Sequence, residues 1–248
     1  MKYSSTELLD FPELPEGTDL RDERILLHCC CAPCSSAIIE WMMANGTRPT
    51  LYFCNPNIYP EQEYLIRKQE LLRYASQLSL RVIDDESMPS WTSWSAYHAS
   101  WLSAVRGMED EPERGPRCLL CFKLRLLSAA RMAQREGIKV FTTTLASSRW
   151  KSIVQIAEAG EWAAQQVGGG VMFDARNWRK GGLQQRRNEL LRENGFYNQL
   201  YCGCEFSLRQ TEQRMAQRDA AQVVATDTEH TTTEGTKLAA TECCRESK

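Results

Sequence analysis

The sequence predicts an α/β protein in which helices cover both faces of a parallel sheet. Short apolar runs alternate along the chain with longer amphipathic segments, which is typical of repeated strand–helix units. No internal repeat is visible. The 248 residues, 42% of them hydrophobic, are enough to bury a core without disulfide bonds. No apolar stretch approaches the roughly 18 residues that a membrane-spanning helix needs.

The expected strands and helices follow one another along most of the chain. Apolar and β-branched runs between turn residues predict strands at 24–30, 50–54, 80–83, 138–143 and 171–173. Apolar residues at helical spacing predict helices at 37–45, 61–78, 91–105, 118–135, 151–167 and 182–194. We expect Ser35 or Ser36 to cap the first helix and Gly46 to end it.

Residues 24–224 are expected to form a single α/β domain with a helical, cysteine-rich C-terminal part. An acidic arm, 1–23, precedes this domain, and its many carboxylates are unlike a signal peptide, so the cytoplasm is the expected compartment. The tail 225–248 is Thr-rich with almost no large apolar residue, and we expect it to be disordered. Cys243 and Cys244 in this tail are interpreted as an accidental pair.

The net charge of −2 conceals a segregation of charge along the chain. Residues 1–24 carry seven acidic and three basic residues, and 205–248 carry eight and six, which leaves +4 for 25–204. Basic residues gather in two stretches of this middle part: Arg114, Arg117, Lys123, Arg125, Arg131 and Arg135, then Arg176, Arg179, Lys180, Arg186, Arg187 and Arg192. Such stretches are either solvated helix faces or patches that attract a polyanion.

Eleven cysteines are far more than packing requires. In the cytosol thiols are kept reduced, so this number favours metal binding or redox chemistry over a disulfide framework. Seven of them stand in three tight clusters: Cys30, Cys31 and Cys34, Cys118 and Cys121, and Cys202 and Cys204. Cys29 and Cys54 are as readily explained as small core residues.

Each cluster has a spacing that can bring sulfurs together. Successive residues of an extended chain face opposite sides, so Cys30, Cys31 and Cys34 converge only if the chain turns, which Pro33 favours. Cys118 and Cys121 share one face of the predicted helix 118–135. Gly203 allows backbone angles that turn Cys202 and Cys204 toward a metal or toward each other.

The residues alone leave the metal open. A structural zinc site and a cubane iron–sulfur cluster each take four thiolates, and either leaves three of the seven cysteines unexplained. A cluster together with a further thiol pair, redox-active or holding a second metal, accounts for all seven and favours an enzyme. A zinc-stabilised RNA-binding module and a thiol redox protein are the alternatives.

Further polar stretches stand at predicted strand ends, where ligands bind in open α/β sheets. Residues 30–31, 54–56 and 142–144 are therefore expected to converge. Thr143 and Lys151 belong to a strand-to-helix turn that suits an anion, and His28 is either an acid or a core residue. Trp178, beside Arg179 and Lys180, is either a base-stacking residue or a core residue.

At these motifs the sequence resembles the cobalamin-independent epoxyqueuosine reductases of the QueH family. The similar segments span about 25–207 in the family's order: LLHCCCAPC at 26–34, CNPNI at 54–58, RCLLCF at 117–122, FTTTL at 141–145, NWRKGG at 177–182 and YCGC at 201–204. The resemblance implies a Rossmann-like fold of the HUP type. It also implies the last step of queuosine synthesis, in which the epoxide of epoxyqueuosine at the tRNA wobble position is reduced.

The resemblance implies roles for the clustered cysteines. Cys30, Cys31, Cys118 and Cys121 would hold a [4Fe–4S] cluster, and Cys202 and Cys204 would be a redox-active pair. Position 34 is an aspartate in some relatives, and Cys34 is a candidate ligand of a second iron. In the alternative arrangement Cys34, Cys204 and one of the paired cysteines hold that iron, and Cys202 completes the cluster.

The implied partners are tRNA, held by its anticodon loop, and an electron donor that the sequence does not identify. Thr143, Lys151, Arg179, Lys180 and Tyr201 are the candidate substrate-binding residues. Bases held in single-stranded loops are the usual targets of sequence-specific RNA recognition, and cationic side chains bind the phosphates around them. No membrane partner is expected.

Overall fold

A computed structural model of the protein describes residues 25–85 and 92–220. Its centre is a five-stranded sheet in which every neighbouring pair is parallel, with the strand order β3-β2-β1-β4-β5. The strands are β1 (Ile25–His28), β2 (Thr50–Phe53), β3 (Val82–Asp84), β4 (Val140–Thr143) and β5 (Met172–Phe173). The order runs outward in both directions from the β1–β4 pair, which is the topology of a doubly wound α/β fold.

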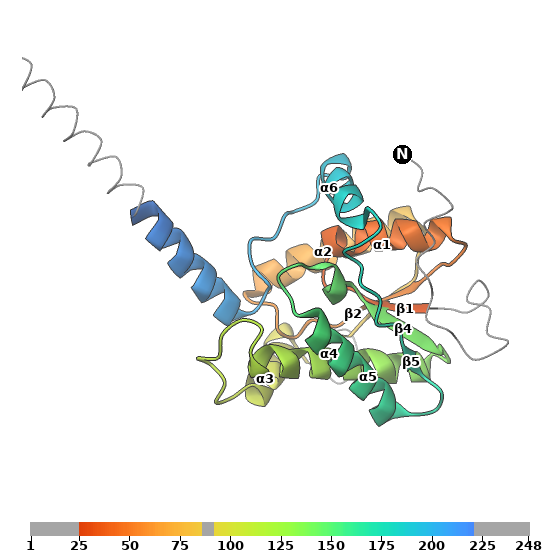
Figure 1. The fold of residues 1–248 in the computed structure, drawn as a ribbon, viewed down its shortest axis with the longest axis horizontal. Coiled ribbons are helices and arrows are strands. Elements are labelled where there is room, and N and C mark those ends of the chain that lie inside the picture. Colours follow the sequence, from red (N-terminus) through yellow and green to blue (C-terminus); the bar gives the residue numbers. More distant parts are fainter. Residues whose placement is uncertain (1–24, 86–91, 221–248) are drawn as a thin grey trace, which may run out of the picture. The chain divides into compact units, whose positions relative to one another are not determined.

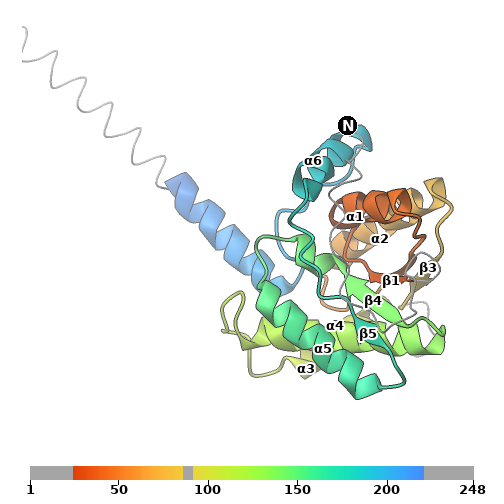
Figure 2. The same ribbon diagram turned by 45° about the vertical axis from the view of Figure 1, so that its right-hand side comes forward.

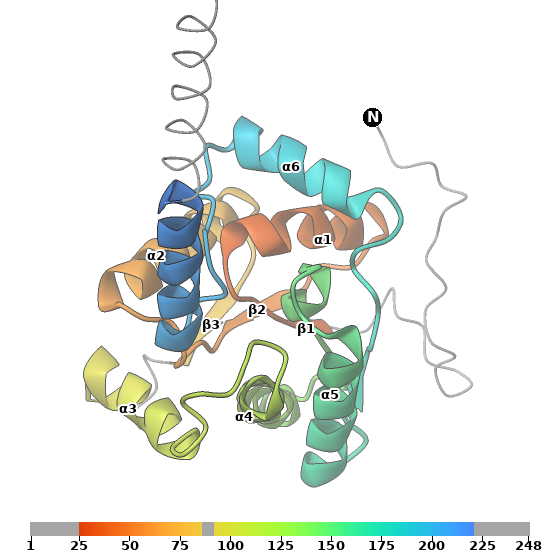
Figure 3. The same ribbon diagram turned by 60° about the vertical axis from the view of Figure 1, so that its left-hand side comes forward.

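Helices cover both faces of this sheet, as the sequence predicts. Figures 1 and 3 show α1, α2 and α6 on one side and α4 and α5 on the other. The helices are α1 (Ala32–Ala44), α2 (Glu61–Gln77), α3 (Trp94–Ala104), α4 (Pro116–Arg135), α5 (Ile153–Val167) and α6 (Leu183–Glu193), with a short 3-10 turn, η1 (Thr144–Ser147), after β4. The predicted α/β class is confirmed.

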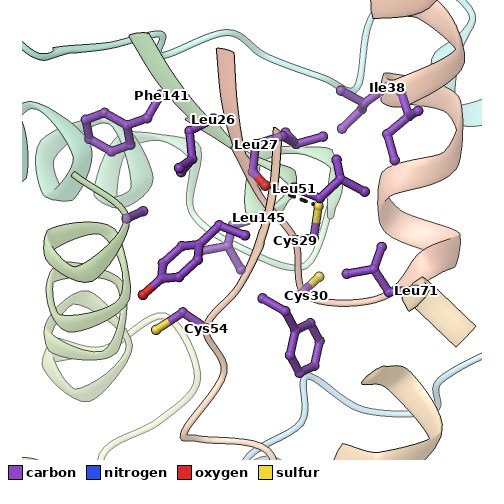
Figure 4. Close-up of a cluster of buried hydrophobic side chains, with 14 of the residues drawn as sticks. Leu26, Leu27, Cys29, Cys30, Ile38, Leu51, Cys54, Leu71, Phe141 and Leu145 are labelled. Carbon is purple, nitrogen blue, oxygen red and sulfur yellow. Dashed lines mark hydrogen bonds between the residues drawn. The ribbon is translucent and has the colours of Figure 1, made fainter. Parts of the chain in front are cut away.

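The three central strands are buried along their whole length. Strands covered on both faces need near-continuous apolar runs, and this requirement explains why β1, β2 and β4 could be found in the sequence. Figure 4 shows part of the resulting core, with Leu26 and Leu27 of β1 beside Leu51 and Phe141 of the adjacent strands.

The packing of α5 against β5 depends on a close contact between the backbone at Gly160 and the ring of Phe173. Figure 2 shows α5 running alongside β5. A Cβ placed on Gly160 of α5 would lie 2.2 Å from the ring of Phe173, so only glycine lets this helix turn meet the strand. Ala159 and Ala163 on the same helix are also fully buried. Small side chains therefore set the distance between α5 and the sheet edge.

The first helix begins earlier than predicted. It starts at Ala32 rather than residue 37, and its N-cap is Cys31, whose Sγ accepts a hydrogen bond from Cys34 N at 3.4 Å. Pro33 fits in the first turn because its missing N–H has no helical partner there. Ser35 and Ser36 lie inside the helix, where their hydroxyls donate back to the carbonyls of Cys31 and Pro33.

The chain divides into two compact units. One contains the described residues up to Gln199 together with Gly203–Glu205, and the other contains Leu200–Cys202 and the described residues from Phe206 onward. Residues 206–220 of the second unit are helical, which confirms the expected helical C-terminal part. The predictions for the arm 1–23 and the tail 225–248, with Cys243 and Cys244, fall outside the described residues. No helix in the described ranges is long and apolar enough to cross a membrane.

Candidate metal and redox site

The expected convergence of strand ends occurs at the β1–β4 pair, where the strand order reverses. His28 is the last residue of β1 and is paired in register with Thr143 of β4. The chain then leaves β1 into the cysteine-rich start of α1, and it leaves β4 into η1. Cys30 N donates to Thr144 Oγ1 at 3.2 Å, so the two departing loops are joined directly. This crevice is where doubly wound sheets bind their ligands.

His28 ties three strand ends together. Its Nε2 lies 3.0 Å from the carbonyl oxygen of Cys54, which only accepts, so this nitrogen carries the proton. Its Nδ1 lies 2.8 Å from Thr143 Oγ1 and therefore accepts from that hydroxyl. Burial, and then the charge of Arg125, lower the pKa of His28 to about 3. A fully buried, neutral imidazole with both nitrogens occupied is a structural crosslink, and the alternative of a catalytic acid does not fit it.

Three sulfur atoms meet beyond β1. The Sγ atoms of Cys30, Cys31 and Cys34 all lie within 4.8 Å of one another, and those of Cys30 and Cys31 are 3.8 Å apart. Thiolates bound at about 2.3 Å to one tetrahedral ion are separated by about 3.8 Å. The three-thiol group therefore has the spacing of three ligands on one metal ion, with a fourth position open to another ligand.

The electrostatics of this group favour one thiolate. Hydrogen bonds donated by Cys31 and Cys34 lower the pKa of Cys30 well below its usual value, and Lys151 and Arg125 add to the effect. Thr144 Oγ1 also lies 3.5 Å from Cys30 Sγ as a donor. Burial raises the pKa of Cys31, and the hydrogen bond to Cys30 raises that of Cys34 to about 11. A bound cation would replace the protons that the two donors now hold.

Cys118 and Cys121 stand in the first two turns of α4, with Cys121 buried and Cys118 half-buried. Cys118 Sγ accepts a hydrogen bond from Arg114 N at 3.3 Å. Neither belongs to the three-thiol group within the described ranges. A four-iron cube holds its ligands farther apart than one ion does. The quartet of Cys30, Cys31, Cys118 and Cys121 stays a prediction.

The Cys–Gly–Cys loop is held at its glycine. Gly203 has φ +130°, and its carbonyl accepts from Tyr59 N at 2.8 Å. A Cβ at this position would lie 3.1 Å from a guanidinium nitrogen of Arg67 and 3.2 Å from Ile58. Cys204 belongs to the same unit as these residues, whereas Cys202 belongs to the second unit, where its N–H donates to Ser207 Oγ at 3.1 Å. The redox pairing of Cys202 with Cys204 stays a prediction.

Arg67 is a buried cation near the cysteine motifs that the sequence patterns did not reveal. It is buried on α2, where its Nε donates to Glu63 Oε1 at 2.7 Å, and Tyr197 OH donates to Glu63 Oε2 at 2.8 Å. Burial works against its charge, but the charges of Cys31 and Glu63 raise its pKa. Its cation therefore acts on the three-thiol group and touches Gly203. In the sequence Arg67 stands among other charged residues of α2, and no motif there marks it as buried.

The candidate substrate-binding residues fall into different environments. Thr143 is fully buried and its hydroxyl, bonded to His28, also accepts from Leu145 N at 3.1 Å, so it is part of the scaffold. Lys151 is half-buried near the thiols, Arg179 donates to the Lys151 carbonyl at 2.7 Å, and Lys180 is exposed. Tyr201 is half-buried in the second unit.

The structure also decides several alternatives among the basic and aromatic residues. Trp178 is 1% exposed and donates to Thr142 Oγ1, so it is a core residue and not a stacking surface. Arg117 is buried and holds the carbonyls of Met108 and Glu109, at 2.9 and 2.8 Å, instead of phosphates. Arg125 is likewise buried, with its Nε donating to the Cys54 carbonyl.

Comparison with known proteins agrees with this geometry. A family model described as "Epoxyqueuosine reductase QueH" matches residues 25–210, most of the chain. The chain belongs to the QueH family. It is 45% identical over 199 residues to the Histophilus somni protein named epoxyqueuosine reductase QueH, covering 80% of this chain and 76% of that protein. It is 40% identical over 213 residues to the Acinetobacter baylyi protein of the same name, covering 85% and 91%.

A third relative, from Haemophilus influenzae, carries the same name and is 43% identical over 197 residues, covering 79% of this chain and 75% of that protein. The QueH family consists of enzymes, and the chain is an oxidoreductase. Three of the six segments in which the sequence resembles the family lie at the carboxyl edge of the sheet, namely 26–34, 54–58 and 141–145.

Proposed function

We propose that this QueH protein reduces the epoxide of epoxyqueuosine at the wobble position of tRNA, the last step of queuosine biosynthesis. The observation that carries the proposal is the three-thiol group of Cys30, Cys31 and Cys34 at the switch point of the sheet. An oxidoreductase of this family needs a redox or metal centre where its substrate binds, and this is the group of metal-ligating residues found within the described ranges.

The reaction fixes what the protein must supply. The epoxide takes up two electrons and two protons, both C–O bonds break, a C=C bond forms, and the oxygen leaves as water. The Cys202 and Cys204 thiols supply that number of electrons and protons when they close to a disulfide. An external reductant then restores the pair. This role is the proposed one, and the alternative is that Cys204 holds a second iron with Cys34.

The metal centre is proposed as a [4Fe–4S] cluster on Cys30, Cys31, Cys118 and Cys121, with a second iron at Cys34. When bound, iron supplies one-electron transfer and a Lewis acid for the departing oxygen. The protein's own contribution is a buried thiolate at Cys30, stabilised by the neighbouring thiols and the charges of Lys151 and Arg125. Arg67 adds a second buried cation on the α2 side.

The substrate is proposed to enter over the exposed residues that follow η1, Arg149 and Trp150, and over the loop before α6. Arg179 and Lys180 lie there and would bind phosphates of the anticodon loop, with Lys151 between them and the thiols. Tyr201 is the remaining candidate contact. Cationic contacts of this kind supply most of the sequence-independent affinity for RNA.

The decisive experiment incubates the anaerobic protein and a chemical reductant with tRNA that contains epoxyqueuosine. Digestion to nucleosides and mass spectrometry should show a product lighter by one oxygen atom. The control is the same reaction with Cys30→Ser, which should leave the epoxide intact. Unchanged epoxyqueuosine with the iron-loaded wild-type protein would contradict the proposal.

A zinc-stabilised RNA-binding module is the second candidate, and the 3.8 Å spacing of Cys30 and Cys31 favours it, because that spacing suits one tetrahedral ion. Metal analysis after anaerobic purification separates the two. About four or five irons per chain and a brown colour support the reductase. A colourless protein with one zinc per chain and no conversion supports the module.

A further inference from the structure

A tryptophan side chain stands exposed beside the candidate site. Trp150 follows η1 and is 66% exposed, and Val154, in the first turn of α5, is 72% exposed. Tryptophan is highly buried on average, because its ring carries a large apolar area. The core offers no explanation for this position, since the ring points away from it.

The backbone that carries this ring is fixed from two sides. Arg114 donates to the Trp150 carbonyl at 2.8 Å and to the Arg149 carbonyl at 3.2 Å. Arg179 donates to the Lys151 carbonyl at 2.7 Å. Side chains from two distant parts of the sequence thus hold the backbone of the segment 149–151, so little backbone entropy remains to be lost when a ligand binds there.

The surroundings of the ring are positively charged. The Arg149 guanidinium lies 4.9 Å from the Trp150 ring centroid. Burial, and then the like charge of Arg114, lower the pKa of Arg179. The salt bridges within 25–85 and 92–220 do not include Arg114, Arg149 or Arg179. Cations that form no ion pair favour an anionic partner.

The segment also adjoins the thiols. The segment follows η1 in the chain, and Thr144, the first residue of η1, accepts a hydrogen bond from Cys30 N at 3.2 Å through its Oγ1. A ligand on the Trp150 ring would therefore lie beside a group bound at the crevice. An exposed aromatic ring among arginines is the combination that binds single-stranded nucleic acid, through base stacking and phosphate contacts.

We propose that Trp150 is a stacking surface for an unpaired RNA base next to the reacting nucleotide, with Arg149 and Arg114 beside the flanking phosphates. The inference rests on the proposed function and specifies how its tRNA is held. Arg149 covers one face of the ring, and the base takes the other. A base inside a duplex is already stacked on both sides, so the surface selects the loop of the anticodon arm.

The test measures binding of the epoxyqueuosine-containing tRNA to wild type, Trp150→Ala, Trp150→Phe and Arg149→Gln over a range of salt. Trp150→Ala should weaken binding by about 5- to 150-fold, the range expected for one stacked base, and Trp150→Phe should retain most of the affinity. The slope of log K against log salt should be unchanged in Trp150→Ala and smaller by about 0.7 in Arg149→Gln. Leu72→Ala, which trims an exposed apolar residue of α2, is the matched control and should bind as wild type does.

The outcomes distinguish failure of the Trp150 stacking surface from failure of the proposed reductase function. Wild-type protein that converts the tRNA while Trp150→Ala binds it with undiminished affinity would overturn the stacking surface and leave the reductase intact. Wild-type protein that neither binds nor converts the tRNA would overturn the reductase and the stacking surface with it. Unchanged thermal unfolding of Trp150→Ala excludes misfolding as the cause of weaker binding.

Discussion

The two loops that leave the β1–β4 pair carry opposite kinds of surface. The segment after β1 carries three thiols, two buried and one half-buried, and it is held by hydrogen bonds from Cys30 N to Thr144 Oγ1 and from Cys34 N to Cys31 Sγ. The segment after η1 exposes an aromatic ring and several cations, and only its backbone is fixed. Buried thiols are shielded and keep their electrostatic environment, whereas an RNA-binding surface must remain open. The comparison indicates that chemistry belongs to the first loop and recognition to the second.

The strongest test of the buried side is Cys30→Ser. We expect iron content to fall and conversion to decrease by more than about 100-fold, because even groups that only contact a metal ligand are commonly worth about 10- to 100-fold. Cys29→Ser is the matched control. Cys29 donates to the Leu27 carbonyl at 3.3 Å within the core, and burial raises the pKa of its thiol (Figure 4). Equal iron loss in both variants would contradict the assignment.

His28→Gln tests whether the hydrogen bonds of His28 to Thr143 and Cys54 hold the ends of the three strands together. The change removes an imidazole with two buried hydrogen bonds and leaves partners unsatisfied, so we expect a loss of about 3 kcal/mol in the free energy of unfolding. Urea denaturation of the metal-free protein measures it. A loss below about 1 kcal/mol would show that the strand ends do not depend on His28.

The same variant gives a pH signature. The pKa of His28 is about 3 in the folded protein against 6.5 ordinarily, so the unfolded chain binds the proton first. The contribution of His28 to stability is then full above pH 6.5 and declines as the pH falls from 6.5 toward 3, by about 1.4 kcal/mol per unit. The stability difference between wild type and His28→Gln should be about 2 kcal/mol smaller at pH 5 than at pH 7.

The parts of this comparison that the sequence could predict are those that local patterns encode. The central strands had to be continuous apolar runs, and the carboxyl-end rule then placed residues 30–31 and 142–144 together. The start of α1 was misplaced because a serine hydroxyl can either cap a helix or bond back to a carbonyl inside it. Ser35 does the second, since Cys31 already occupies the cap.

What the sequence could not predict depends on contacts between distant segments. Arg117 and Arg125 stood in an unbroken basic stretch, yet both guanidinium groups hold backbone carbonyls in the interior. Trp178 and Trp150 are flanked by similar residues, but one is buried and the other exposed. Whether a side chain is exposed depends on which segments pack against it. Outside helices and strands, no periodic pattern in the sequence predicts this packing.

Gly203→Ala tests the contact between the Cys202–Cys204 loop and Arg67. Its φ of +130° and the 3.1 Å approach to Arg67 both oppose a methyl group, so we expect a cost of about 1–3 kcal/mol in unfolding and slower conversion. Gly137→Ala is the matched control, with φ +64° but nothing within 4 Å of the new Cβ. A larger cost at Gly137 than at Gly203 would refute the role given to the Arg67 contact.

The smallest effect is expected for Lys180→Gln, in the loop before α6. Lys180 is exposed beyond Arg179, and removing one phosphate contact should weaken tRNA binding several-fold at low salt, with the salt slope smaller by about 0.7. Arg48→Gln, which changes an exposed base that holds the end of α2, is the control. An unchanged slope would mean that the RNA does not reach Lys180, so recognition would depend on Arg114 and Arg149, the cations around Trp150.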